Sequence, residues 1–166
     1  MNALASCLDS LSPSTWRARP HSFIALMSLY ESNYLRLARL AGPPRGLEGS
    51  IDSVVVGDCD LLLTVTERTP YTTTMQLTYL MHLGPGRERE PVPDLCIRVY
   101  HDARLVEALA GSAEHANDAP DGSRGRAVRE LEQRWARNMM LNKWLDYCVE
   151  RGHSLRLPRA SGLRDR

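Results

Sequence analysis

The sequence is short of lysine and of net charge. Of its 166 residues, 21 are lysine or arginine and 20 are aspartate or glutamate, which leaves a formal charge of +1. This balance creates no overall field that would attract nucleic acid or an anionic membrane. Lys143 is the only lysine. Because the arginines are scattered along the chain, we interpret their excess as a compositional bias rather than as selected chemistry.

Paired cysteines and long apolar runs are also missing. The four cysteines lie far apart and lack the C-x-x-C or C-x-x-H spacing of a zinc site, so neither a metal site nor a disulfide framework is expected. No segment approaches the roughly 18 apolar residues that cross a bilayer. The first residues lack the basic region and the apolar core of a signal peptide. These absences favour a cytoplasmic protein with free thiols.

The local motifs that mark many enzymes are absent as well. The chain contains no glycine-rich phosphate loop, no G-x-S-x-G elbow and no H-E-x-x-H metal motif. The sequence therefore predicts neither a cofactor nor a metal. It favours a non-enzymatic protein, although missing motifs alone do not exclude an enzyme.

Apolar periodicity divides the chain into a helix, a series of strands and a second helix. From Phe23 to Ala41 apolar side chains recur at three- and four-residue steps, with Ser32 and Arg36 on the opposite side, which predicts a helix over 22–41. A second helical pattern covers 126–151 and includes Val128. Between them the period is two, and the expected strands are 50–56, 59–67, 71–80, 94–100 and 104–109.

These elements predict an α+β fold, in which an antiparallel β-meander of about five strands carries the N-terminal helix and the long C-terminal helix on one face. The Gly- and Pro-rich stretch 84–93 is expected to be a loop, and 154–158 a short edge strand. Residues 21–158 are expected to form a single domain, preceded by a flexible arm (1–20) and followed by a disordered tail (159–166).

Four stretches, "LYESNYLRLARL", "YTTTMQLTY", "IRVYHDARLVEAL" and "LNKWLDYCVERGH", occur in this order. In sequence and spacing the chain resembles the YqiB-like family of uncharacterised proteobacterial proteins, from about Leu26 to His153. The resemblance implies a small cytoplasmic protein of a Gram-negative bacterium and implies no activity. Relatives carry an aromatic, Pro-Asn and charged stretch before the last helix, where this chain reads "DGSRGRAVRELEQRW".

The adjacent pair His101-Asp102 is the first candidate site. Neighbouring residues of a strand point to opposite faces, so the pair cannot hold a metal jointly without a turn. An aspartate at a tight hairpin accepts backbone hydrogen bonds, and this structural role is the favoured interpretation. The alternative is a cluster of His101 and Asp102 with Glu67, Arg68 and Tyr71 at the end of the sheet.

Four further features of the sequence bear on a possible site. Glu31, Asn33 and Tyr34 are candidates for lining a pocket between helix and sheet. A threonine-rich row of the third strand, which includes Thr74 and Thr78, is expected to face water. The remaining aromatic residues, Tyr30 among them, are expected to pack in the core. A possible anion-binding strip on the last helix comprises Arg126, Arg129, Arg134 and Arg137.

The sequence favours a binding or regulatory protein that recognises a protein partner or a small anionic ligand. One alternative is an enzyme that acts on a nucleotide or phosphoester through the His101 cluster. The other is weak nucleic-acid binding through the arginine strip, which is unlike known platforms because no aromatic residues interleave with it. No membrane partner is expected, and the sequence does not indicate an oligomeric state.

Overall fold

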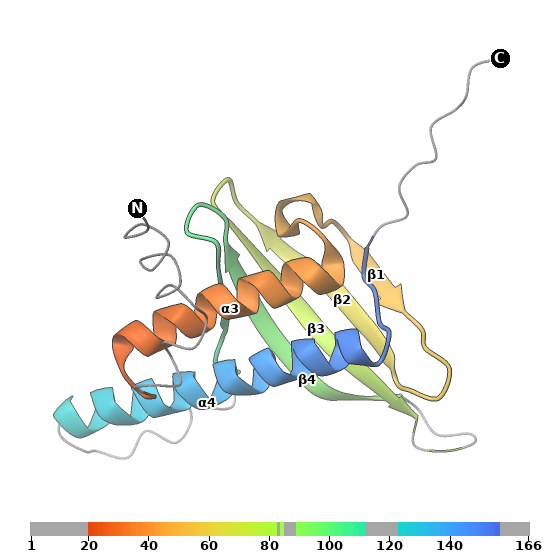
Figure 1. The fold of residues 1–166 in the computed structure, drawn as a ribbon. Coiled ribbons are helices and arrows are strands. Elements are labelled where there is room, and N and C mark those ends of the chain that lie inside the picture. The colour runs from red at the N-terminus through yellow and green to blue at the C-terminus, as the bar shows by residue number, and fades with distance from the viewer. Residues whose placement is uncertain (1–19, 83, 85–88, 112–122, 157–166) are drawn as a thin grey trace, which may run out of the picture.

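The computed structural model describes residues 20–82, 84, 89–111 and 123–156. Two long helices lie side by side over one face of an antiparallel sheet (Figure 1). The order of elements is α3 (Phe23–Ala41), a short 3₁₀ turn η2 (Pro44–Gly46), β1 (Ser50–Ser53), β2 (Asp60–Arg68), β3 (Thr72–His82), β4 (Arg89–Tyr100), β5 (Leu105–Ala108) and α4 (Ser123–Glu150). The predicted α+β class is confirmed. Residues 1–19 of the predicted arm (1–20) and the whole predicted tail (159–166) lie outside the described residues, and the domain limits stay a prediction.

The sheet is a meander, because its spatial order β1-β2-β3-β4-β5 follows the chain. Each strand pairs antiparallel with the next one in the chain. The main core lies between this sheet and the helices, and Leu63, Met75, Leu77 and Ile97 are completely buried in it. A second, smaller cluster fills the space between the N-terminal halves of the helices, around Leu29. There the two helices extend past the β4 and β5 side of the sheet (Figure 1).

Several predicted boundaries and faces are wrong. Phe23 and Val128, the first members of the predicted stripes, are exposed near the N-terminal ends of α3 and α4, although Tyr30 and Trp135, two turns further along the same faces, are buried. The first strand ends at Ser53, and Val56 is fully exposed. The chain over 89–93 is not a loop but the start of β4.

The C-terminal segment also differs from its prediction. Residues 154–156 form no strand; instead the Leu155 backbone N–H donates to the carbonyl of Leu40, at 3.0 Å, and the Leu155 side chain is completely buried. Residues 157–158 lie outside the described part of the chain. The predicted helix over 126–151 begins earlier, at Ser123.

The predicted water-facing threonine row is covered in part. Thr74 and Thr78 are both only 6% exposed. The Thr74 hydroxyl contacts Glu67 and Arg98 from the flanking strands, and the Thr78 hydroxyl donates to Asp94. Long charged side chains therefore lie across the shorter threonines of the central strand, an arrangement that strand alternation alone does not reveal.

A buried polar network joins the two helices to the edge strand β5. Asn138 Oδ1 accepts hydrogen bonds from the Ala108 backbone N–H (2.9 Å) and from Asn33 Nδ2 (3.2 Å). Asn33 Nδ2 also donates to the Val106 carbonyl at 3.4 Å. Asn142 Nδ2 donates to Asn33 Oδ1 at 2.9 Å. An edge strand leaves backbone groups unpaired on its outer side, and here two asparagine amides satisfy them.

Candidate functional site

A cleft of about 280 Å³ opens between α3, the β4–β5 hairpin and α4. Residues of all of these elements line it. Figure 1 shows that the two helices extend past the β4 and β5 side of the sheet. Clefts that join several elements are the usual place for a small-ligand site. The lining residues are Met27, Tyr30, Tyr100, Ala103, Leu105, Glu107 and Arg134.

The carboxylate of Glu107 is the polar centre of the cleft. The Tyr30 phenol donates a hydrogen bond to its Oε1 at 3.1 Å, and the Tyr100 phenol donates one to its Oε2 at 3.0 Å. Arg134 Nη1 lies 3.6 Å from Oε1. The Glu107 side chain is only 13% exposed. A carboxylate so largely removed from water depends on partners of this kind.

The surroundings fix the protonation of these partners. Burial, and then the charge of Glu107, raise the pKa of Tyr30 and that of Tyr100. The pKa of Arg134 is also raised, chiefly by its hydrogen bond to Glu130, whose carboxylate lies 2.8 Å from Arg134 Nε. Both phenols therefore stay neutral donors near pH 7, and the guanidinium stays charged.

Strand alternation explains why Glu107 leaves the core. Val106 and Ala108 are completely buried, so the Glu107 side chain between them points to the opposite face of the sheet. Because β5 is the last strand of the sheet, its outer edge has no neighbouring strand and can be reached by side chains of the two helices. Tyr30 on α3 and Arg134 on α4 reach Glu107 from there.

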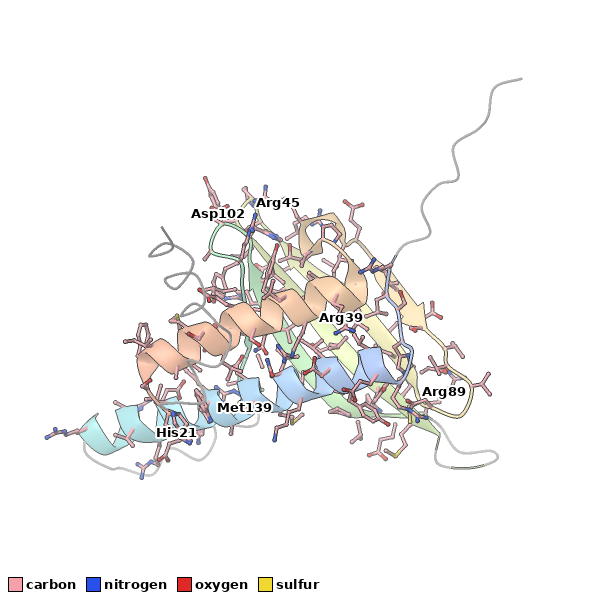
Figure 2. All side chains as sticks on the ribbon, in the orientation of Figure 1. His21, Arg39, Arg45, Arg89, Asp102 and Met139 are labelled. Atoms are coloured by element: carbon pink, nitrogen blue, oxygen red, sulfur yellow. The ribbon has the colours of Figure 1, made fainter. Side chains whose placement is uncertain are left out.

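The structure places His101 and Asp102 in the turn between β4 and β5. His101 Nε2 lies 2.8 Å from the Thr73 hydroxyl, and Asp102 Oδ1 lies 3.4 Å from Arg45 Nη2. Figure 2 shows Arg45 and Asp102 together at this end of the sheet, whereas Arg89 lies at the opposite end. Burial, followed by the charges of Arg45 and Arg68, lowers the pKa of His101. The two side chains thus have different partners.

Of the other members of the predicted His101 cluster, Tyr71 and Arg68 lie near His101: the Tyr71 carbonyl accepts from the His101 backbone N–H at 2.9 Å, and the charge of Arg68 acts on the His101 ring. The side chains of Glu67 and Arg68 have other partners. A bulge between Val65 and Glu67 changes the register at the end of β2. Glu67 lies 3.7 Å from Arg98 and contacts Thr74 on the helix-free face. Arg68 instead binds Glu48, at 3.2 Å, and the Leu47 carbonyl. Tyr71 is 66% exposed.

The predicted pocket residues on α3 diverge around the helix. Glu31 is exposed, Asn33 is part of the buried polar network, and Tyr34 packs against the main core. The structure does not bring these three together. Tyr30, predicted as a core residue, is the one whose hydroxyl faces the cleft; it is also buried.

Of the four arginines in the predicted anion-binding strip, Arg134 lines the cleft. Its guanidinium lies between the carboxylates of Glu130 and Glu107. Arg126 and Arg129 are exposed on the first turns of α4, and Arg137 is partly buried. The strip therefore does not present four equivalent cations on one surface.

The sequence does not predict Tyr30, Tyr100 or Glu107 as site residues. One local signal points to Glu107: it is an acidic residue between Val106 and Ala108 in a strand of only four residues.

Over the described part of the chain, no group of three or more His, Cys, Asp or Glu side chains could hold a metal ion. None of the described helices combines the length and the apolar character that a membrane span requires.

Comparison with known proteins identifies relatives without an assigned role. Residues 36–154 match the sequence profile of the family described as "Protein of unknown function (DUF1249)". The chain is 28% identical over 130 residues to the "Uncharacterized protein YqiB" of Escherichia coli strain K12, covering 78% of this chain and 90% of the relative. The same figures hold for YqiB of E. coli O157:H7. No solved structure matches. The matched segment includes Tyr100, Glu107 and Arg134 of the cleft. Because the match covers most of the chain, the chain belongs to the DUF1249 family of proteins of unknown function.

Proposed function

We propose that this chain is a non-enzymatic binding protein whose ligand occupies the cleft between α3, α4 and the β4–β5 hairpin. The observation that carries the proposal is the Glu107 carboxylate, 13% exposed and bound by two phenols and a guanidinium beside an open cleft. Burying a charge costs free energy unless its partners compensate. An oriented carboxylate beside open space is therefore better explained by recognition than by stability alone.

The same geometry gives an enzyme little support. A general base needs a free, titratable group within reach of its substrate. Here the raised pKa values of Tyr30 and Tyr100 keep both phenols protonated, and Glu107 accepts from both of them. The His101 cluster offers no better arrangement, since Glu67 and Arg68 have separate partners.

Binding of nucleic acid through the arginine strip has weak support too. Affinity for a phosphate backbone requires cations that can replace counterions. Arg134, in the middle of the strip, already lies between Glu130 and Glu107. The cytoplasmic location stays a prediction from the sequence.

The proposal is tested by native purification followed by mass spectrometry of bound small molecules and proteins. Replacing Ala103, which lines the cleft, by phenylalanine fills the cleft. We expect wild type to retain a ligand that Ala103→Phe loses. Ala136→Phe makes the same substitution at an exposed position of α4 outside the cleft and should retain the ligand. A ligand retained equally by Ala103→Phe, or no bound ligand in wild type, would contradict the proposal.

A further inference from the structure

Resting on the proposed function, we infer that the cleft receives an uncharged apolar side chain, aromatic or branched, of a partner protein. Such a group differs from the small anionic ligand that the arginine pattern suggests. Three features of the molecule point to it: the mutual pairing of the polar side chains around Glu107, the apolar remainder of the lining, and the apolar surface beside the cleft.

The polar side chains of the cleft pair with one another. The Tyr30 hydroxyl donates to Glu107 at 3.1 Å and accepts from Arg134. The Tyr100 hydroxyl donates to Glu107 at 3.0 Å and accepts from Arg98. The two ionised side chains of the lining, Glu107 and Arg134, carry opposite charges and lie 3.6 Å apart. Both the hydrogen-bonding groups and the charges of the lining are thus matched within the protein.

A charged ligand and an apolar ligand would affect this network differently. An entering ammonium or carboxylate group would have to compete with a partner already bound to Glu107 or Arg134, and the displaced side chain would lose that partner in a largely buried place. An apolar group leaves every pair intact and only covers it, which costs little because the polar atoms already have partners. Glu107 then serves the site by holding the two tyrosine rings in position as walls.

The rest of the lining is apolar and has the size of one large side chain. Met27, Ala103 and Leu105 provide aliphatic surface, and the rings of Tyr30 and Tyr100 line the same space. Aromatic side chains pack favourably against other aromatic rings. An apolar cavity of about 150 Å³ holds benzene. The cleft, at about 280 Å³, therefore has room for one ring together with its stem.

Apolar surface continues from the cleft onto the first turn of α3, at the end that extends past the sheet (Figure 1). Phe23, Met27 and Tyr30 follow one another at steps of four and three residues, so they share one face of the helix. Met27 and Tyr30 line the cleft, whereas Phe23 lies outside it and is 68% exposed, and the adjacent Ile24 is 73% exposed. A free molecule that fills only the cleft leaves Phe23 in water. A protein whose side chain enters the cleft also covers the apolar surface around it, as at other protein interfaces.

The first test uses four capped amino acids, the N-acetyl-N-methylamides of phenylalanine, leucine, lysine and glutamate, because each presents one side chain between two peptide groups. Each compound is titrated into the full-length protein, and the backbone amide signals of Ala103 and Glu107 are followed by NMR. We expect the phenylalanine and leucine compounds to shift both signals and to bind about tenfold more tightly than the lysine and glutamate compounds, because their side chains remove apolar surface from water. Added salt should not weaken this binding, because no ion pair forms.

Two variants show whether the response comes from the cleft. Ala103→Phe fills the cleft, so the phenylalanine compound should no longer shift the Glu107 signal. Ala136→Phe makes the same substitution at an exposed position outside the cleft and should keep the shift. Equal shifts in both variants would overturn the inference, as would tighter binding of the lysine or glutamate compound or no response to any of the four.

A matched pair of variants tests whether the ligand is a protein. Phe23→Ser and Leu35→Ser each remove an apolar side chain from α3, at positions that are 68% and 66% exposed, and only Phe23 lies on the face that lines the cleft. In the native purification that tests the proposed function, we expect the protein bound by wild type to be lost from Phe23→Ser and retained by Leu35→Ser. Both variants should still bind the phenylalanine compound. Equal retention by the two variants, or a free apolar molecule in place of a protein, would overturn the assignment to a protein.

Failure of this inference is distinguishable from failure of the proposed function. A charged small molecule that wild type retains and Ala103→Phe loses would overturn the apolar side chain and leave the cleft as the binding site. A ligand that wild type and Ala103→Phe retain equally would overturn both.

Discussion

Replacing Asn138 by leucine should destabilise the protein by removing the acceptor that satisfies the edge of β5. Asn138 is completely buried, and its Oδ1 accepts from the Ala108 backbone N–H at 2.9 Å and from Asn33 Nδ2 at 3.2 Å. In Asn138→Leu the Ala108 N–H loses its side-chain acceptor, while Asn33 keeps only its longer contact to Val106, at 3.4 Å, as acceptor for Nδ2. A buried donor without an acceptor costs about 1–3 kcal/mol.

Leucine would recover part of this loss through its greater apolar burial, which leaves a net decrease of about 2 kcal/mol in the free energy of unfolding. Urea denaturation followed by circular dichroism measures it, as a fall in the midpoint with an unchanged slope. The control is Gln133→Leu, which removes an amide from an exposed position of the same helix. It should change the free energy by less than about 0.5 kcal/mol. Equal stability of Asn138→Leu and wild type would refute the reasoning.

Three further predictions concern the other end of the helix pair. Burial raises the pKa of Tyr79 above its ordinary value. The neutral phenol therefore contributes stability that is fully present below pH about 10 and is lost as the pH rises further. Tyr79→Phe should reduce this loss, which urea titrations at alkaline pH measure. Burial also raises the pKa of the Cys148 thiol to about 11, so peptide mapping after thiol labelling at pH 8 should find Cys148 unlabelled in native protein and labelled in urea; equal labelling would contradict this. The hydrogen bond from Arg151 lowers the pKa of Asp58; its contribution to stability is present above pH about 4 and is lost at lower pH, so Asp58→Asn should lose less stability than wild type on acidification.

The sequence predicts the strands best where alternate residues are buried. In β2, Leu61 and Leu63 are completely buried and Leu62 is not, so the burial follows the period of two that the sequence shows. The pattern fails at the start of β4, where Pro91 and Pro93 resemble a loop. There β4 pairs with β3 alone, because β5 reaches only from Ile97 to Tyr100. A proline is tolerated where one side of a strand has no partner strand.

The helix prediction fails where polar residues are buried. On α3 the buried stripe includes Ser32, which the periodicity places on the opposite side, and Asn33, which the sequence predicts as pocket lining. Asn33 is buried because it has partners on α4 and β5, more than 70 residues away in sequence. No local pattern contains those partners, so the burial of Asn33 follows from tertiary contacts.

The candidate site illustrates the same limit. His101 and Asp102 attract attention because they are adjacent, yet adjacency gives their side chains different partners. The residues that do meet come from α3, β4, β5 and α4, and no motif spacing links them. Such convergence depends on how far the helices extend beyond the sheet.

The cleft and the edge of β5 are built from the same helical faces. Tyr30 precedes Asn33 by three residues on α3, and Arg134 precedes Asn138 by four on α4, so each cleft residue lies one turn from a residue that binds β5. Loosening β5 in Asn138→Leu should therefore also weaken binding of the ligand that occupies the cleft, because Glu107 is carried by that strand. Tyr79→Phe, which acts in the main core away from the cleft, should leave this binding unchanged. Wild-type affinity in Asn138→Leu would show that the edge of the strand and the cleft are independent.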